Sequence, residues 1–346
     1  MTRTTTFQRA RRLVLHAGAA TLLTGMLPRA HGREPGVELC VDPALAAYGF
    51  PPPHPFGTDR QAAFLREAMA AGLPERTTLA PSRVADDAEI ARFHAPSHLA
   101  RVRSAPAAGL AFLDDGDTPV FPGMHEAAAR VVGTALDSLA RIVAGRTRCS
   151  LQPIGGLHHA ARAAAAGFCV YNDIGVVIET LRSVHAIERI AYVDIDAHHG
   201  DGVFYAYEDD PALILADLHQ DSRTLYPGSG RPEETGRGAA RGTKLNIELP
   251  PGTGDAAFIA AFARVETHLA RFEPQFFLFQ CGADSLDGDP IAQLALSPAA
   301  HAGAARRLLA LARWYAGGRL MAFGGGGYRR DNLARAWTAV LRELLA

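Results

Sequence analysis

The sequence predicts an α/β fold in which helices cover both faces of a central, largely parallel β-sheet, within one domain that spans residues 37–346. Two observations lead to this prediction. Short runs of β-branched, aromatic and other apolar residues alternate with longer segments of helical periodicity, and such alternation is typical of parallel strands joined by helices. No Pro/Gly-rich stretch divides the pattern, because the Gly/Arg-rich segment 227–242 falls inside it.

Each element follows from its own local pattern. Segments with apolar residues at helical spacing are expected to be helices, and they cover residues 59–71, 126–144, 174–183, 255–272, 298–315 and 332–345. Short apolar runs without that spacing are expected to be strands, and they cover residues 37–41, 150–154, 189–195, 212–218, 244–249, 275–280 and 320–323. Because many of these runs lack polar alternation, we expect both faces of the sheet to be buried.

Residues 1–36 differ from the rest and are predicted to lie outside the fold. The pair Arg11 and Arg12 precedes the apolar stretch 13–27, which is too short to span a bilayer but is about the length of a signal-peptide core. A small-residue cleavage site at 30–32 would complete a leader of the twin-arginine type. A histidine interrupts the apolar stretch, and a start codon assigned too early would leave a similar extension. We therefore expect a cytoplasmic protein without a membrane span, with export as the alternative.

The composition excludes several classes of protein. With 346 residues, 48% of them hydrophobic, and 35 basic against 36 acidic side chains, the chain is neither disordered nor fibrous. A net charge of -1 without clustered basic residues gives no footprint for direct nucleic-acid binding. The four cysteines are far apart, which argues against a disulfide framework or a thiolate metal site. Lys244 is the only lysine, so Schiff-base chemistry is not expected. The oligomeric state stays open.

Four segments rich in functional side chains directly follow or end predicted strands. They are Gly-Gly-Leu-His-His at 155–159, Asp-Ile-Asp-Ala-His-His-Gly-Asp at 194–201, Cys-Gly-Ala-Asp at 281–284 and Gly-Gly-Gly-Gly-Tyr at 324–328. In an open parallel sheet, ligands bind beyond the carboxyl ends of the strands. We therefore expect these four segments to converge on one site.

The second and third of these segments predict a metal site. Asp196 and His198 are two residues apart at a strand end, so in extended geometry their side chains point to the same side, and Asp284 would join them from another strand. Oxygen and nitrogen ligands without cysteine suit Zn²⁺ or another first-row divalent ion, and three protein ligands leave positions open for water and substrate. The alternative is that these aspartates only cap helices, but segment 194–201 holds three aspartates and two histidines, more than capping requires.

The first and fourth segments predict acid–base chemistry. His158 and His159 are suited to proton transfer, with Asp194 and Asp201 as carboxylate partners that orient an imidazole; the alternative is a pair of structural histidines. Tyr328 follows four glycines, and a phenol placed there can donate to a developing oxyanion. The competing interpretation of the glycines, a phosphate-binding loop, lacks the G-x-x-x-x-G-K-[ST] pattern.

These motifs together resemble the histone deacetylase family of the arginase/deacetylase superfamily, in its bacterial acetoin-utilisation and amidohydrolase branch. The resemblance is carried by GGLHHA, GFCVYND, YVDIDAHHGDG, QCGADSLDGDP and FGGGGY, with HPFGTDR and LDDGDTP, and it covers roughly residues 37–346. It implies one three-layer αβα domain with an eight-stranded, mostly parallel sheet. It also implies one catalytic zinc ion and hydrolysis of an acetyl-amide to acetate and free amine.

The resemblance assigns a role to each matching position. It implies zinc ligands at Asp196, His198 and Asp284; catalytic histidines at His158 and His159, with Asp194 and Asp201 as their partners; and a transition-state tyrosine at Tyr328. It implies a substrate tube walled by Gly167, Phe168 and Tyr226, with Asp117 holding substrate backbone at the rim. The implied substrate is an acetylated lysine in a protein or peptide, with acetylpolyamines or other small acylated amines as the alternative. A different class of function is a catalytically silent acyl-lysine binding module.

Three further positions bear on the metals. The two-metal, arginase-like branch would need carboxylates at positions 200 and 286, which hold Gly200 and Leu286; one catalytic ion is therefore expected. Relatives often carry a serine that helps to hold a structural potassium ion, at the position of Asp217 in this chain. An aspartate can also ligate a cation, so the sequence leaves potassium open.

Overall fold

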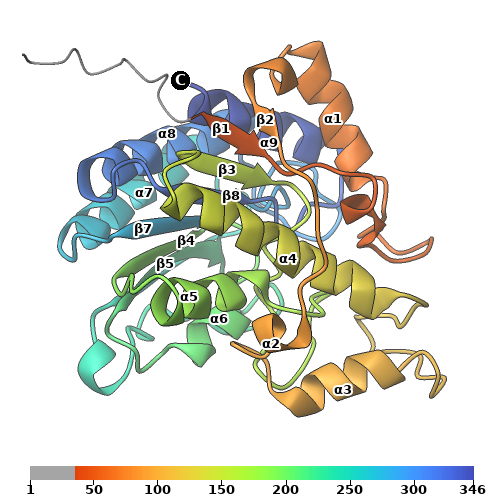
Figure 1. Cartoon of the computed structure of the whole chain (residues 1–346). Helices are drawn as coiled ribbons and strands as arrows, with labels where there is room; N and C mark the ends of the chain where they lie inside the picture. The colour runs from red at the N-terminus through yellow and green to blue at the C-terminus, as the bar shows by residue number, and fades with distance from the viewer. Residues whose placement is uncertain (1–35) are drawn as a thin grey trace, which may run out of the picture. The chain divides into compact units, whose positions relative to one another are not determined.

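The computed structural model describes residues 36–346 and contains an eight-stranded sheet in the order β2-β1-β3-β8-β7-β4-β5-β6 (Figure 1). The strands are β1 (Val37–Leu39), β2 (Thr78–Leu79), β3 (Cys149–Gln152), β4 (Ile190–Asp194), β5 (Leu213–Gln220), β6 (Lys244–Leu249), β7 (Phe276–Gln280) and β8 (Leu320–Phe323). Every pair of neighbouring strands is parallel. The predicted α/β fold with a parallel sheet of about eight strands is confirmed. The predicted leader, apart from its last residue, lies outside the described residues.

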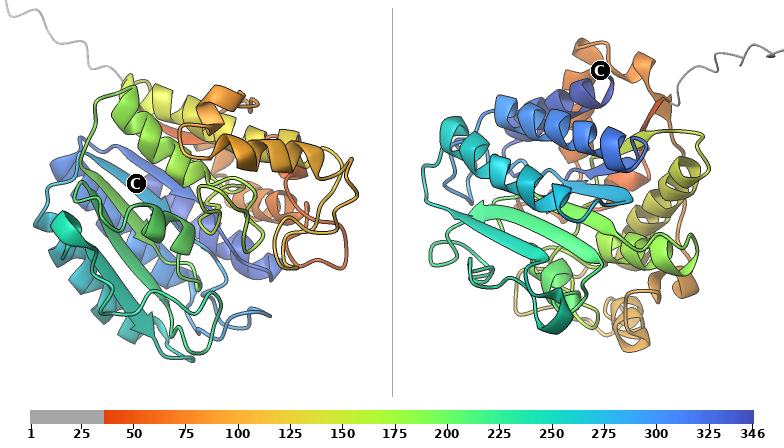
Figure 2. Two further views of the ribbon diagram at one scale, coloured as in Figure 1. Left: turned by 90° about the horizontal axis from the view of Figure 1, so that it is seen from below. Right: turned by 90° about the vertical axis from the view of Figure 1, so that its left-hand side faces the viewer.

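Helices cover both faces of the sheet, as Figure 2 shows from two further directions. One apolar cluster joins the sheet to α2 (Asp87–Ile90), α3 (Pro96–Ser104), α4 (Met124–Val143), α5 (Asp173–Ser183) and α6 (Asp201–Ala206). A second cluster joins the other face to α1 (Arg60–Ala70), α7 (Asp255–Ala270), α8 (Pro298–Tyr315) and α9 (Arg330–Leu344). Burial of apolar side chains on both faces is the main stabilisation of such a sheet.

The central strands explain why the apolar runs were recognisable in the sequence. All residues of β4, β5, β7 and β8 are buried, including the uninterrupted aromatic and aliphatic run that begins at Phe276. The predicted strands and the six predicted helices are all present, with ends that differ by a few residues. Elements without a prediction are short: β2, α2, α3, α6 and the 3₁₀ turns Leu45–Ala47, Pro74–Arg76 and Gly238–Ala240.

Strand register decides which side chains meet at the functional edge. Asp194, the last residue of β4, pairs with Gln280 of β7 on one side and with Asp217 of β5 on the other. In the neighbouring pair of strands β3 and β8, the last residues Gln152 and Phe323 also lie opposite each other. The segments that follow β3, β4, β7 and β8 therefore leave the sheet at the same edge. Within residues 36–346, no helix is long and apolar enough to cross a membrane.

Candidate metal centre and active site

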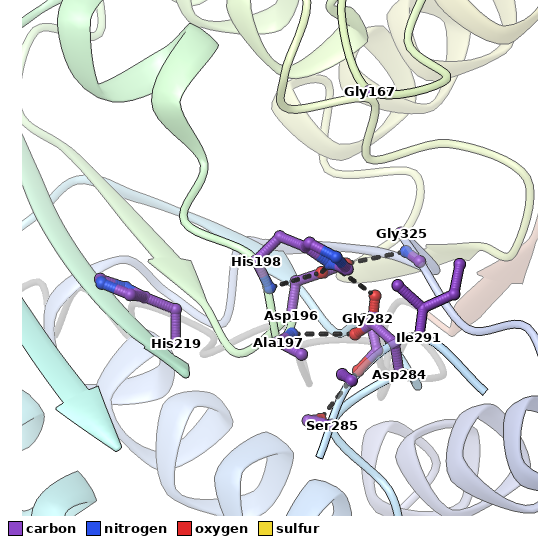
Figure 3. A network of polar contacts seen from close by, with 12 residues as sticks. Gly167, Asp196, Ala197, His198, His219, Gly282, Asp284, Ser285, Ile291 and Gly325 are labelled. Carbon is purple, nitrogen blue, oxygen red and sulfur yellow. Dashed lines mark hydrogen bonds and ion pairs between the residues drawn. The ribbon is translucent and has the colours of Figure 1, made fainter. Parts of the chain in front are cut away.

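Asp196, His198 and Asp284 converge as the sequence predicts (Figure 3). The first two follow β4 and the third follows β7, and one ligand atom from each lies within 4.8 Å of the others. The Nδ1 atom of His198 is 3.0 Å from Asp196 Oδ1 and 3.1 Å from Asp284 Oδ2. All three side chains are buried. Among the described residues this is the only group of three or more His, Cys, Asp or Glu side chains close enough to hold a metal ion.

The chemistry of these three side chains fits a divalent cation. Burial, and then the charge of Asp196, raise the pKa of Asp284 to about 7, as expected for a buried carboxylate that lies beside a second one. A dication removes that repulsion, and two carboxylates with one imidazole are donors that suit Zn²⁺. Backbone N–H groups orient the carboxylates, since Gly326 donates to Asp196 and Ala197 donates to Asp284.

Gln280 supports the metal site and was not predicted. Its Nε2 donates to Asp196 Oδ2 over 2.8 Å, and its Oε1 accepts the N–H of Gly282 over 2.7 Å. It thereby fixes one ligand and the turn that leads to Asp284. The sequence could have pointed to Gln280 only by its place at the end of a predicted strand, directly before Cys281.

The two histidines of the first segment are held by the two predicted carboxylates. His158 Nδ1 is 2.7 Å from Asp194 Oδ2, and His159 Nδ1 is 2.7 Å from Asp201 Oδ1. Burial alone lowers the pKa of His158, but Asp194 and Asp196 outweigh it and raise the pKa to about 9. Burial and the neighbouring His158 lower the pKa of His159 to about 4, against the opposing effect of Asp201. The His158 imidazole thus favours the protonated form, whereas the His159 imidazole favours the neutral form.

The backbone before His158 is also held by a buried acid that was not predicted. Asp173, the first residue of α5, accepts the N–H groups of Gly156 and Leu157 over 2.9 and 2.8 Å. It lies in the GFCVYND segment, which marked it for attention without assigning it a contact. The contact fixes the turn that presents both histidines.

Tyr328 reaches the site from the glycine-rich turn after β8. A Cβ atom on Gly326 would lie 2.1 Å from Asp284 Oδ2, so the close approach of this turn to the metal site requires glycine. The N–H of Tyr328 donates to Asp289, a further residue that was not predicted. Burial, with Asp284 and Asp196, raises the pKa of Tyr328 well above its usual value, so the phenol keeps its proton. Within residues 36–346, no hydrogen bond uses the Tyr328 hydroxyl.

Three of the four predicted substrate-binding residues surround these groups. Gly167 has a φ of +52°, and a Cβ there would lie 2.6 Å from the His159 ring. The Phe168 ring makes an edge contact with the Tyr328 ring at 5.8 Å, and the Tyr226 ring is 5.2 Å from that of His159. A narrow cavity of about 10 Å³ is lined by Gly167, His159, Asp196, His198 and Tyr328, among others.

Asp117, the fourth residue, lies on an exposed loop and does not line this cavity. The carboxylate of Asp114 accepts the N–H groups of Asp117 and Thr118, and the Thr118 hydroxyl accepts the N–H of Phe168 over 3.1 Å. The loop is thereby attached to the cavity wall. The side chain of Asp117 is exposed and is oriented by no hydrogen bond within the described chain.

His54, next to one of the predicted wall residues, was not predicted. Its ring is 4.5 Å from the ring of Phe168 in an edge contact. It belongs to the HPFGTDR segment, which marked it without assigning it a contact.

Comparison with known proteins agrees with this geometry. The family described as "Histone deacetylase domain" matches residues 54–344, most of the described chain. The chain belongs to the histone deacetylase domain family. The acetoin utilization protein AcuC of Bacillus subtilis is 33% identical over 311 residues, which cover 87% of this chain and 80% of that protein. Histone deacetylase 8 of Xenopus tropicalis is 31% identical over 81% of this chain and 76% of that protein. A crystal structure of the HDA15 HD domain superposes with a TM-score of 0.82 at 25% identity, over 90% of this chain and 88% of that chain.

Asp217, at the position where relatives often carry a potassium-binding serine, is fully buried. The N–H of Gly200 donates to its Oδ2 over 2.9 Å, and His219 Nδ1 lies 2.7 Å from its Oδ1.

Proposed function

We propose that the chain is a zinc-dependent deacetylase that hydrolyses the acetyl-amide of an acetylated lysine in a protein or peptide to acetate and free amine. The observation that carries the proposal is the convergence of the buried Asp-His-Asp cluster, two carboxylate-paired histidines and a tyrosine around one narrow cavity. The catalytic unit is proposed to comprise residues 37–346, with Asp196, His198 and Asp284 as the metal ligands.

The two histidines have different roles: His159 carries out the proton transfers and His158 acts electrostatically. A zinc ion bound here would polarise the acetyl carbonyl and lower the pKa of a coordinated water. His159 Nδ1 donates to Asp201, so its Nε2 carries the lone pair that accepts a proton from the attacking water and later returns it to the amine. His158, paired with the fully buried Asp194, supplies positive charge beside the reaction. Tyr328 donates its hydroxyl hydrogen to the oxyanion.

The aromatic residues proposed to line the substrate tube favour an extended, apolar substrate chain. Phe168 and Tyr226 present aromatic surface on which the methylenes of an acyl-lysine can pack. Tyr226 is 43% exposed and Asp117 lies on an exposed loop, so a peptide can reach both from solvent. We propose that Asp117 accepts backbone N–H groups of that peptide. The exposure of Tyr226 and Asp117 favours acetylated peptides over small acylated amines.

The direct test measures metal content and acetate release with the full chain. Purified protein loaded with Zn²⁺ is assayed on an acetyl-lysine peptide, an acetylpolyamine and a small acetylated amine. We expect about one zinc per chain and the highest kcat/KM on the peptide. Higher kcat/KM on the acetylpolyamine would reassign the substrate, and metal binding without turnover on any acylated amine would identify a silent binding module.

A further inference from the structure

One arginine side chain links the turn that carries Tyr328 to a second segment of the cavity lining. Arg330 is the first residue of α9 and lies two positions after Tyr328. Its Nη1 donates to the carbonyl oxygens of Tyr328 and of Pro55, over 3.0 Å in both cases. Pro55 directly precedes Phe56, which lines the same cavity as Tyr328. One guanidinium therefore fixes two parts of the cavity lining relative to each other.

Asp59 holds this guanidinium in place. Its Oδ2 accepts from Arg330 Nε over 2.9 Å, and its Oδ1 accepts from Nη2 over 2.7 Å. Such a bidentate pair fixes the plane of a guanidinium as well as its position. The chain packs closely around the pair, since a Cβ atom on Gly57 would lie 2.7 Å from Asp59 Oδ1 and 2.9 Å from Arg330 Nη2. Four of the five N–H groups of Arg330 are used in these contacts.

Both members of the pair depart from the local preferences of the helices that they begin. Asp59 is the N-cap residue of α1, where an aspartate usually accepts an N–H of the first turn, but within residues 36–346 its side chain makes no such bond. Arg330 places a positive charge in the first turn of α9, where the helix dipole disfavours it. Departures from local preference are expected where a residue serves a site. The contact between the two residues therefore points to a role at the Tyr328 turn.

The backbone of Tyr328 is held on both sides. Its N–H donates over 2.9 Å to the buried Asp289, and its carbonyl oxygen accepts from Arg330. The Asp59 side chain is 64% exposed and that of Arg330 27% exposed, and ion pairs this exposed contribute little to the free energy of unfolding. Positioning has a larger effect, since a misplacement of about 1 Å can lower a rate by about 100-fold.

We propose that Arg330, held by Asp59, is a positioning residue that keeps the Tyr328 hydroxyl where it can donate to the oxyanion. The inference rests on the proposed function, because Arg330 acts through the tyrosine of that reaction. The same guanidinium holds the carbonyl of Pro55, so its removal loosens the segment before Phe56 as well.

Two substitutions of Arg330 separate its hydrogen bonds from its charge. Arg330→Met keeps an aliphatic stem and removes all the donors. Arg330→Lys keeps the charge, but an ammonium cannot form the bidentate pair and also reach both carbonyl oxygens. Arg335→Met is the matched control on the same helix, since Arg335 donates to the Asp331 carbonyl and to Asn332 Oδ1 within α9.

Steady-state kinetics of the zinc-loaded full chain on an acetyl-lysine peptide measure the effect of these substitutions. We expect kcat to fall by about 10–100-fold in Arg330→Met, with a much smaller change in KM. We expect Arg330→Lys to recover only part of this loss and Arg335→Met to match the native chain. Native kcat in Arg330→Met, or full recovery in Arg330→Lys, would overturn the proposal.

A double-mutant cycle with Tyr328→Phe distinguishes positioning from a general structural role. If Arg330 acts through the Tyr328 hydroxyl, its removal has no further effect on kcat once that hydroxyl is absent. We therefore expect the double variant to have the kcat of Tyr328→Phe alone. Losses that multiply in the double variant would show that Arg330 acts independently of the tyrosine, and would overturn the proposal.

Hydrogen exchange followed by mass spectrometry tests the contact without turnover. We expect peptides that cover residues 54–59 and 324–331 to exchange faster in Arg330→Met than in the native chain, with zinc affinity unchanged. Asp59→Asn, which removes the charge of an exposed side chain, should show a smaller increase in the same two peptides and serves if Arg330→Met does not fold. Exchange at the native rate in both variants would overturn the proposal. Absence of acetate release from the native chain would instead refute the proposed function, and with it the catalytic consequence of this contact.

Discussion

The Nε2 atoms of His158 and His159 lie 3.1 Å apart, so only one proton can lie between these two nitrogens. Their carboxylate partners differ in environment: the Asp194 side chain is fully buried, whereas that of Asp201 is 22% exposed. Removal of either imidazole therefore has two separable consequences, one for stability and one for chemistry.

The first prediction contrasts these two histidines. His158→Ala leaves Asp194 buried without its partner and should lower the free energy of unfolding by about 3–5 kcal/mol. His159→Ala leaves a partly hydrated Asp201, so its stability cost should be smaller, while loss of the base should lower kcat by about 10²–10⁴-fold. Urea denaturation and steady-state kinetics measure both. Equal stability losses, or full turnover in His159→Ala, would contradict the assignment.

The second prediction concerns the Tyr328 hydroxyl. Because no group of the described chain pairs with it, Tyr328→Phe should fold and bind zinc as the native protein does. Loss of an oxyanion donor should lower kcat by about 10²–10³-fold with little change in KM. Tyr205→Phe is the matched control, since its hydroxyl donates to Glu234 and not to any metal ligand. A Tyr328→Phe enzyme with native kcat would exclude the proposed role.

The third prediction tests Gln280 as the support of a metal ligand. Gln280→Leu removes the donor to Asp196 and the acceptor for Gly282, and such losses typically weaken metal affinity by about 10–100-fold. Competition with a chromogenic chelator measures zinc affinity without any assay of turnover. Gln275→Leu, just before the opposite end of β7, should bind zinc normally. Native affinity in Gln280→Leu would refute the support role.

The contrast between Gln280 and Asp284 shows how far the sequence could lead. Asp284 was predicted because it lies just after a strand, in a short motif that suggests a metal ligand by itself. Parallel strands bring their carboxyl ends to one edge of the sheet, so the other ligands were expected nearby. Gln280 acts on a residue 84 positions away, and Asp289 on one 39 positions away. Contacts at that separation depend on strand order, which the pattern of apolar runs does not specify.

The same reasoning explains which elements had no prediction. The central strands are buried on both faces and therefore appear as uninterrupted apolar runs. Strand β2 has only two residues, both exposed, and owes its conformation to pairing with β1. Helix α6 spans six residues that begin within the Asp/His-rich segment, so its helical pattern was too short to recognise.

The fourth prediction concerns His54, whose ring lies against the ring of Phe168. Its Nδ1 accepts the N–H of Phe56 over 3.1 Å, and its ring contacts those of Phe50 and Phe168 at 4.6 and 4.5 Å. Such ring contacts contribute about 0.5–1.5 kcal/mol, so His54→Ala should raise KM by roughly 2–10-fold and leave kcat nearly unchanged. His54→Phe keeps the ring and should retain most of the affinity. A fall in kcat at constant KM would argue against a role in substrate binding.

The fifth prediction uses the only lysine of the chain. Lys244 Nζ is buried and donates to the carbonyl oxygens of Asp210 and Leu213 and to the Thr243 hydroxyl. Burial lowers its pKa from 10.5 to about 8. Between these two values the unfolded chain binds more protons than the folded chain, so this group makes the free energy of unfolding rise with pH.

Lys244→Arg isolates this effect, because arginine keeps its charge throughout this range. We expect the stability of the native protein relative to Lys244→Arg to increase by up to roughly 3 kcal/mol between pH 8 and pH 10.5, at about 1.4 kcal/mol for each pK unit. Urea denaturation at a series of pH values measures the difference, and Lys244→Met provides a second non-titrating reference. Curves that stay parallel across this window would show that Lys244 keeps its ordinary pKa, and that its three hydrogen bonds offset the cost of burying the charge.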